Sequence, residues 1–366
     1  MHAQTAALAF LSHDEPICLQ PFGQGNINRT YKVTTASGRQ YILQQINHHI
    51  FRDPTSLMAN VCAVTDFLRR KDSDPLHTLH FLPTGHGAFV HQDLDGNFWR
   101  MYSFIPGQTL EKITDPRDFY RCGLGFGKFQ MLLADFPAHT LRETIPNFHN
   151  TPQRYHQLRA AIAADKAGRA HQVQTEIDFL LAHEVHAGIL QQRLDAGILP
   201  LRVTHNDTKL SNILFDSAGL PQCILDLDTV MPGLSAMDYG DAIRSGAATA
   251  PEDETDTDKM ALDLALFQAF TEGFLEATTT LTPAELDALP LAPLVITLEQ
   301  ACRFLTDYLE GDVYYHISYP THNLVRTRAQ ITLATDMLAK MPLMERIIKD
   351  NIEIKEEPYD TEIYWR

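Results

Sequence analysis

The sequence predicts an α+β protein of two lobes, in which a small antiparallel sheet precedes a mainly helical region. Two observations carry this prediction. Short runs rich in β-branched and aromatic residues, separated by turn residues, occupy most of the first 105 positions. Long stretches with helical periodicity dominate from residue 116 onward. The chain has 366 residues and a hydrophobic content of 44%, which is enough for a core in each lobe.

The first lobe is predicted to hold an antiparallel sheet and one helix, the helix covering residues 54–70. The strands are expected at 18–23, 27–36, 40–46, 87–92 and 98–105. Ile105, Pro106 and Gly107 follow the last strand, and this combination is typical of a hinge. We therefore predict one lobe at 1–105 and a second at 106–366.

The second lobe is predicted to be mainly helical, with one interruption. Helices are expected at 116–135, 154–195, 258–278 and 294–310. Short β-type runs interrupt them at 198–207, 212–216 and 222–228, and polar residues crowd the turns between these runs.

Charge and composition limit the kinds of partner. The formal net charge of −16 disfavours a nucleic-acid surface, which would concentrate lysine and arginine, so we expect a small-molecule partner. The N-terminal stretch has no basic region typical of a signal peptide, and no apolar run approaches the roughly 20 residues that span a bilayer. The five cysteines form no CxxC pair. These features predict a cytoplasmic protein without membrane contact; the sequence carries no signal for its oligomeric state.

The most informative string is HNDTKLSN at 205–212, followed by DLD at 226–228. An aspartate, an asparagine five positions later and an aspartate at a strand end match the spacing of a kinase catalytic loop, which predicts a protein-kinase-like fold using ATP and Mg²⁺. Asp207 is the candidate base, because a hydroxyl nucleophile needs a carboxylate to accept its proton. Asn212 and Asp226 offer the hard oxygen ligands that Mg²⁺ prefers.

Two further residues of this string are assigned roles. Lys209 is expected to offset charge on the transferring phosphate. Asp228 has the same period-two facing as Asp226 and is a candidate second metal ligand or a supporting group. The alternative is that both strings are ordinary turns, since Asn and Asp favour turns. Their joint spacing, each after an apolar β-type run, favours the catalytic interpretation.

A glycine-containing loop lies between the first two predicted strands. Glycines there would let backbone N–H groups approach phosphates closely, although a lone G-x-G is also compatible with a simple β-turn. We predict that the nucleotide contacts come from this loop and from the end of the fifth strand. They are Gly23, Gly25, Asn28, Tyr102 and Phe104.

These motifs together resemble those of the aminoglycoside phosphotransferase and choline kinase superfamily. The shared features are G-x-x-N-x-x-Y at 25–31, FIPG at 104–107, the catalytic string and ILDLD at 224–228. Longer strings resemble the N-acetylhexosamine 1-kinases in order and across nearly the whole chain. These strings are YILQQIN, LRVTHNDTKLSNIL, DLDTVMPG, DYGDAIR, RFLTDYLEGDVYY and HNLVRTR.

The narrower resemblance implies phosphorylation of the anomeric hydroxyl of N-acetylglucosamine or N-acetylgalactosamine to the α-1-phosphate, with Asp207 acting on that hydroxyl. It also implies that Arg303 and Tyr314 contact the sugar, and that Asn26 and Asn28 approach from the glycine loop. Asp241 in DYGDAIR is expected to brace the catalytic loop. From the pattern alone, Arg303 could instead form a surface ion pair with Asp307 or Glu310, and Tyr314 could belong to the core.

The sequence departs from the common kinase pattern in one important respect. Gln44 and Gln45 stand where kinases place the strand lysine that pairs the α- and β-phosphates, and residues 54–70 contain no glutamate to partner one. The N-acetylhexosamine 1-kinases share the glutamine pair. Two alternatives stay open: another kinase of the superfamily, acting on choline, ethanolamine, homoserine or an aminoglycoside, and a pseudokinase that binds without turnover.

Overall fold

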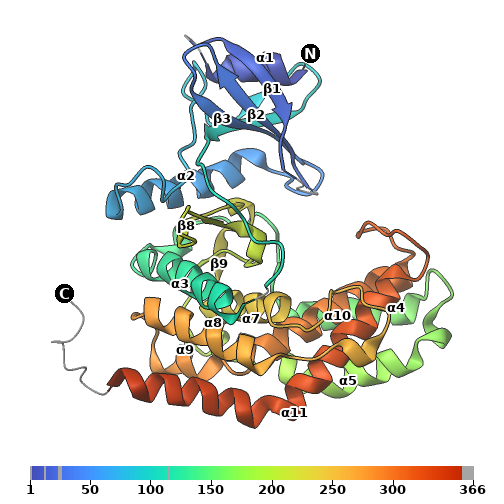
Figure 1. The fold of residues 1–366 in the computed structure, drawn as a ribbon. Helices are drawn as coiled ribbons and strands as arrows, with labels where there is room; N and C mark the ends of the chain where they lie inside the picture. Colours follow the sequence, from blue (N-terminus) through green and yellow to red (C-terminus); the bar gives the residue numbers. More distant parts are fainter. Residues whose placement is uncertain (1, 12–13, 24–26, 114, 357–366) are drawn as a thin grey trace. The chain divides into compact units, whose positions relative to one another are not determined.

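The computed structural model describes residues 2–11, 14–23, 27–113 and 115–356, with the side chains of 354–356 outside that description. These residues form two compact units (Figure 1). The first is built from three stretches, 1–109, 135–146 and 212–232, and the second from 110–134, 147–211 and 233–366. The predicted α+β class, with an N-terminal antiparallel sheet and a helical C-terminal region, is confirmed. The lobe boundary at residue 105 stays a prediction.

A five-stranded sheet is the centre of the first unit. Its strand order is β1-β2-β3-β5-β4, and every neighbouring pair is antiparallel. The strands are β1 (Pro16–Pro21), β2 (Arg29–Thr35), β3 (Gln40–Ile46), β4 (His91–Gln92) and β5 (Phe98–Ser103). The fourth strand, predicted from residue 87, is reduced to two residues. The chain turns before it, with Gly87 in the left-handed region at φ 83°.

The two faces of this sheet carry different side chains. Helix α1 (His2–Phe10) packs on one face, where Val33 and Leu43 are completely buried. Because side chains alternate along a strand, Lys32, Gln44 and Arg100 lie on the opposite face. This opposite face therefore carries polar and charged side chains next to the buried Ile42 and Ile46.

The other elements of the first unit are a helix and two short strands. Helix α2 (Pro54–Lys71) begins at Asp53, whose carboxylate accepts a hydrogen bond from the Ser56 N–H at 3.0 Å. Strands β7 (Ile213–Phe215) and β8 (Pro221–Ile224) form an antiparallel pair. The Asn60 amide on α2 donates to the carbonyls of Arg142 and Val230, at 2.7 and 3.1 Å, so α2 is tied to both later stretches of the unit.

The second unit is mainly helical (Figure 1). Its helices are α3 (Pro116–Leu132), α4 (Thr151–Ala164), α5 (Gln174–Ala187), α6 (Ile189–Asp195), α7 (Ser235–Gly246), α8 (Leu264–Ala277), α9 (Pro283–Ala288), α10 (Ala292–Glu310) and α11 (His322–Glu356). The short strand β6 (Arg202–Thr204) precedes the catalytic string. Strand β9 (Met231–Gly233) follows the DLD string, and only its last residue belongs to the second unit.

The single helix predicted at 154–195 is wrong, because the chain breaks it into α4, α5 and α6. Asp165 caps α4 in the left-handed conformation at φ 36°, and Gly168 follows at φ 67°. The helices α7, α9 and α11 were not predicted. No helix within the described residues is long and apolar enough to cross a membrane.

Helices α3 and α8 approach each other very closely in the second unit. A Cβ added to Gly273 on α8 would lie 2.0 Å from the carbonyl oxygen of Tyr120 on α3. A Cβ on Gly123 would lie 2.3 Å from the carbonyl oxygen of Phe270. Backbone atoms cannot swing aside as side chains do, so glycine is required at these contacts.

We predict that Gly273→Ala lowers the free energy of unfolding by about 1–3 kcal/mol, since the added methyl must push two helices apart. Chemical denaturation measures this change. Gly188→Ala is the control, because a Cβ there meets only the mobile end of the Gln192 side chain, at 3.0 Å. Equal stability of the two variants would contradict the close-packing argument.

Candidate active site

The catalytic string follows β6 and is held by one buried carboxylate of α7. Asp238 accepts hydrogen bonds from the backbone N–H groups of His205 and Asn206, at 2.8 and 2.7 Å. The Gln130 side chain donates to the same carboxylate at 3.0 Å. Burial raises the pKa of Asp238 above its ordinary value. Asn206 adopts a left-handed conformation at φ 63°, so these bonds hold the loop in a shape that a non-glycine residue rarely adopts.

Asp241, one helical turn further along α7, holds the next part of the loop. Its carboxylate accepts a hydrogen bond from the Thr208 N–H at 3.1 Å and an ion pair from Arg244 at 2.9 Å. Burial, the largest effect, would raise the pKa of Asp241, but the Arg244 guanidinium, His149 and the Thr208 hydrogen bond together lower it. This agrees with the bracing role predicted for Asp241. Asp238 was missed, although it belongs to the same DYGDAIR string.

The candidate base is accessible where its neighbours are buried. The Asp207 side chain is 30% exposed, whereas His205 has no exposed surface. Lys209 lies 2.8 Å from the Asp207 carboxylate. The structure thus brings the two residues predicted to be catalytic into direct contact, and their roles stay predictions.

The predicted sugar residues Arg303 and Tyr314 also belong to the second unit. The Arg303 guanidinium lies 5.6 Å from the ring of Tyr315 and 5.5 Å from that of Phe148. A hydrogen bond with the Tyr314 hydroxyl is among the causes that raise the pKa of Arg303; desolvation, the largest effect, acts in the opposite direction. Tyr314 is 63% exposed, so it is not a core residue.

The alternative of an Arg303 ion pair with Asp307 or Glu310 is not what the described residues form. Glu310 pairs with Lys166 at 3.0 Å. Asp307 instead accepts backbone hydrogen bonds from three consecutive residues, 313–315, at 2.8 to 2.9 Å. This carboxylate fixes the backbone that carries Tyr314, and sequence reasoning had treated it only as a possible partner of Arg303.

The predicted metal ligands Asn212 and Asp226 lie at one end of the β7–β8 pair in the first unit. Ile213 pairs with Ile224, and the Leu225 N–H donates to the Asn212 carbonyl at 2.8 Å. Asp226 then adopts the left-handed conformation at φ 53°. An amide oxygen and a carboxylate on neighbouring backbones are a donor set that suits Mg²⁺.

Asp228 is engaged by two other side chains. Arg100 of β5 forms a buried ion pair with one carboxylate oxygen, and both side chains are 3% exposed. The Asn28 amide donates to the other oxygen at 2.7 Å. Both oxygens of Asp228 thus have side-chain partners, and the metal roles of Asp226 and Asp228 stay predictions.

Arg100 stands opposite one of the two glutamines predicted at the strand-lysine position. Gln44, at the lysine position of β3, is the direct cross-strand partner of Arg100, and its side-chain oxygen accepts from the Arg100 Nε at 2.9 Å. Desolvation, the largest effect, would lower the pKa of Arg100, but Asp228 and, to a smaller extent, Tyr102 and Asp226 together raise it. The positive charge thus stands on the neighbouring strand. The sequence did not predict the role of this arginine, because Arg100 and Gln44 are 56 positions apart in the chain.

The predicted nucleotide contacts have different surroundings. Asn28 accepts from the Asn47 N–H at 3.0 Å in addition to its bond to Asp228, and Tyr102 packs against Phe81 with ring centroids 5.1 Å apart. Lys32 lies 3.6 Å from the ring centroid of Phe104. Gly23 has a positive φ of 75°, which suits a tight turn. Gly25 and Asn26 lie outside the described residues.

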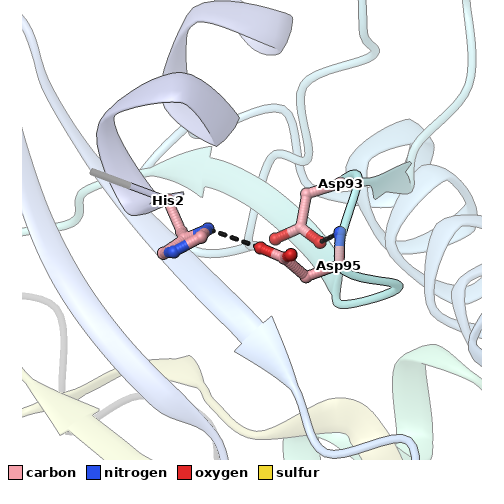
Figure 2. A group of neighbouring side chains, drawn as sticks. All are labelled: His2, Asp93 and Asp95. Atoms are coloured by element: carbon pink, nitrogen blue, oxygen red, sulfur yellow. Dashed lines mark hydrogen bonds and ion pairs between the residues drawn. The ribbon is translucent and has the colours of Figure 1, made fainter.

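An exposed group of His2, Asp93 and Asp95 is close enough in geometry to hold a cation (Figure 2). Its hydrogen bonds explain the arrangement without one. Desolvation acts in the opposite direction, but bonds from Trp99 and Asn97 lower the pKa of Asp93 to about 2, and His2 pairs with Asp95 at 2.8 Å. We therefore interpret this group as part of the structure around the turn before β5, and we assign it no metal role.

The fold is that of small-molecule kinases and related phosphotransferases. Amicoumacin kinase hAmiN, solved with AMP-PNP and Ca²⁺, is 15% identical with a TM-score of 0.61, and the match covers 90% of this chain and 91% of that one. An aminoglycoside phosphotransferase from Alicyclobacillus acidocaldarius is 13% identical with a TM-score of 0.60, covering 95% and 96%. A microcompartment-associated aminopropanol kinase is 16% identical with a TM-score of 0.55, covering 96% and 98%.

The sequence match identifies the family. The model of the phosphotransferase enzyme family (APH) matches residues 19–273, which include the glycine loop, the catalytic string and the DLD string. The chain belongs to this family. The superfamily predicted from the motifs is therefore confirmed.

We predict that Arg100→Met lowers the free energy of unfolding by about 3–5 kcal/mol, because it leaves Asp228 buried without its cation. The double variant Arg100→Met, Asp228→Asn removes both charges and keeps an acceptor for Asn28, so it is expected to recover much of that stability. Urea denaturation with all variants gives the comparison.

Arg117→Met is the matched control, because Arg117 is 84% exposed in its pair with Asp115 and exposed pairs contribute about 1 kcal/mol at most. A double variant no more stable than Arg100→Met alone would show that the buried pair is not the cause.

Proposed function

We propose that this protein is an ATP- and Mg²⁺-dependent N-acetylhexosamine 1-kinase that phosphorylates the anomeric hydroxyl of N-acetylglucosamine or N-acetylgalactosamine. The family supports phosphoryl transfer to a hydroxyl group. The observation that carries the choice of acceptor is the cationic and aromatic character of the residues around Arg303. The resemblance of the long sequence strings supports the same choice.

In this proposal Asp207 is the general base. Its carboxylate takes the proton of the anomeric hydroxyl as the hydroxyl oxygen bonds to the γ-phosphorus of ATP, and the bond from that phosphorus to the bridging oxygen breaks to release ADP. Lys209 offsets charge on the transferred group, from its position beside Asp207. The backbone bonds to Asp238 and Asp241 hold the base without touching its carboxylate.

Asn212 and Asp226 would hold the metal ion. When bound, Mg²⁺ would neutralise phosphate charge and orient the phosphates for in-line transfer. Asp228, which forms the buried ion pair with Arg100, would support this site from the side. Gly23, Gly25, Asn28, Tyr102 and Phe104 remain our candidates for nucleotide contact.

The charges near Arg303 argue against a cationic acceptor. Arg154 is close enough for the Arg303 charge to contribute to lowering its pKa, although burial is the larger cause. Two guanidinium groups would repel choline, ethanolamine or an aminoglycoside, whereas the hydroxyl and acetamide oxygens of a neutral sugar can accept their hydrogen bonds. Exposed aromatic rings such as Tyr314 suit the apolar face of a sugar ring.

The substrate is tested by ADP release with ATP and Mg²⁺ against N-acetylglucosamine, N-acetylgalactosamine, glucose, choline, ethanolamine and homoserine. Turnover of the N-acetylhexosamines, with phosphorus NMR placing the phosphate on the anomeric oxygen, is the expected result. Turnover of a cationic acceptor alone would overturn the acceptor assignment. Binding of ATP without turnover of any acceptor would favour a pseudokinase.

Asp207→Asn is expected to lower kcat by about 10²- to 10⁴-fold, since the amide cannot accept the proton. Equilibrium binding of ATP should change little, which separates loss of the base from loss of the nucleotide site. Asp216→Asn, in the β7–β8 turn, is the control with an unchanged kcat. Near-normal turnover by Asp207→Asn would remove it from the mechanism.

Arg303→Ala is expected to raise the KM for the sugar by about tenfold to a hundredfold, the loss of one charged hydrogen bond. The KM for ATP should stay close to that of the unchanged protein. Arg328→Ala is the control, because Arg328 is half-exposed on α11 and pairs with Glu176. A sugar KM that is the same in both variants would contradict the role of Arg303.

A further inference from the structure

The side chain of His149 links helix α10 to the catalytic string within the second unit. His149 lies just before α4, and its side chain is 12% exposed. The Nδ1 atom lies 2.8 Å from the Glu299 carboxylate on α10, and Nε2 lies 3.2 Å from the carbonyl oxygen of Asn206. Asn206 immediately precedes the proposed base, and Arg303 lies one helical turn beyond Glu299.

The hydrogen-bond partners indicate which form of the imidazole is present. A carbonyl oxygen only accepts, so Nε2 must donate to Asn206. Thr151 donates to the second oxygen of Glu299 at 2.7 Å, as it would to an ionised carboxylate. With Glu299 ionised, Nδ1 donates as well, and a histidine that donates from both nitrogens is an imidazolium.

The electrostatics of the pair agree with this state. Burial is the largest effect on both groups and opposes their charge, but the partner group and further neighbours together outweigh it. The pKa of His149 is raised above its ordinary value and that of Glu299 is lowered. Asp241 on α7 also raises the pKa of His149, while Arg303 on α10 lowers it. These are the charged groups that act on the imidazole.

We propose that the His149 imidazolium, held by Glu299, is the positioning residue that fixes the left-handed backbone of Asn206 and so sets the catalytic base. The inference rests on the proposed role of Asp207. Asn206 is held from both sides: its N–H donates to Asp238, and its carbonyl accepts from His149. A left-handed non-glycine residue is strained and persists only when its surroundings impose it. A charge-assisted bond on the carbonyl supplies that constraint.

The pair should make activity depend on pH in a particular direction. The pKa of His149 is raised in the folded protein. The stabilisation that its charged imidazole provides is therefore complete below pH 6.5, its ordinary pKa, and is lost as pH rises through the folded pKa. The pKa of Glu299 is lowered, so the stabilisation from its carboxylate is present above pH 4.5 and is lost as pH falls through its folded pKa. The alkaline decline of kcat is therefore expected to follow His149.

The test combines imidazole ¹⁵N NMR titration with pH profiles of kcat in the full-length protein. Glu299→Gln should lower the pKa of His149 by about 1–3 and move the alkaline decline of kcat by the same amount. Thr151→Val is the second variant, for use if Glu299→Gln folds poorly, because it leaves both charges in place. It should lower the pKa of His149 by a smaller amount. His149→Gln should lower kcat about tenfold or more and abolish this decline. His156→Gln, on the exposed face of α4, is the control with an unchanged profile.

Two results would overturn the proposal. One is a His149 imidazole that is already neutral across pH 6–8 in the unchanged protein. The other is an alkaline decline of kcat that Glu299→Gln does not move. The NMR titration needs no acceptor, so it decides the state of His149 even if N-acetylhexosamines are not substrates. The kinetic profile then uses whichever acceptor the substrate panel identifies.

Discussion

The catalytic loop depends on the carboxylate of Asp238, which accepts two adjacent backbone N–H groups inside the second unit. A buried carboxylate is costly unless it is hydrogen-bonded, and buried N–H groups carry the same requirement. The two requirements satisfy each other, so the loop after β6 has little freedom to adopt another shape. Asp241 repeats the arrangement at Thr208. The backbone on both sides of the candidate base is therefore held by carboxylates of α7.

The same principle organises the first unit. Arg100 and Asp228 are both almost completely buried, and each neutralises the other. The pair joins the sheet face that carries Gln44 to the residues that follow β8, and Asn28 adds a bond from the start of β2. The positive charge beside Gln44 is therefore paired within the protein, with Asp228.

The fold and the choice of acceptor are supported by different observations. The family match and the solved structures define phosphoryl transfer and the architecture, but proteins of this fold act on acceptors as different as amicoumacin and aminopropanol. The proposed choice of acceptor rests on side chains such as Arg303 and Arg154, whose charges would discriminate between cations and neutral sugars. The His149–Glu299 pair links α10, the helix that carries Arg303, to the catalytic loop.

The sequence by itself determined the sheet, most of the helices and the catalytic string, because strand alternation, helical periodicity and motif spacing are local properties of the chain. It did not reveal the break at Asp165, where a single left-handed residue ends a helix without disturbing the pattern around it. Only the tertiary structure decided the partners of the buried charges. Arg100 and Asp228 are 128 positions apart, and His149 and Glu299 are 150 apart. Such pairs leave no local pattern, since each charge is compensated only after the chain has folded.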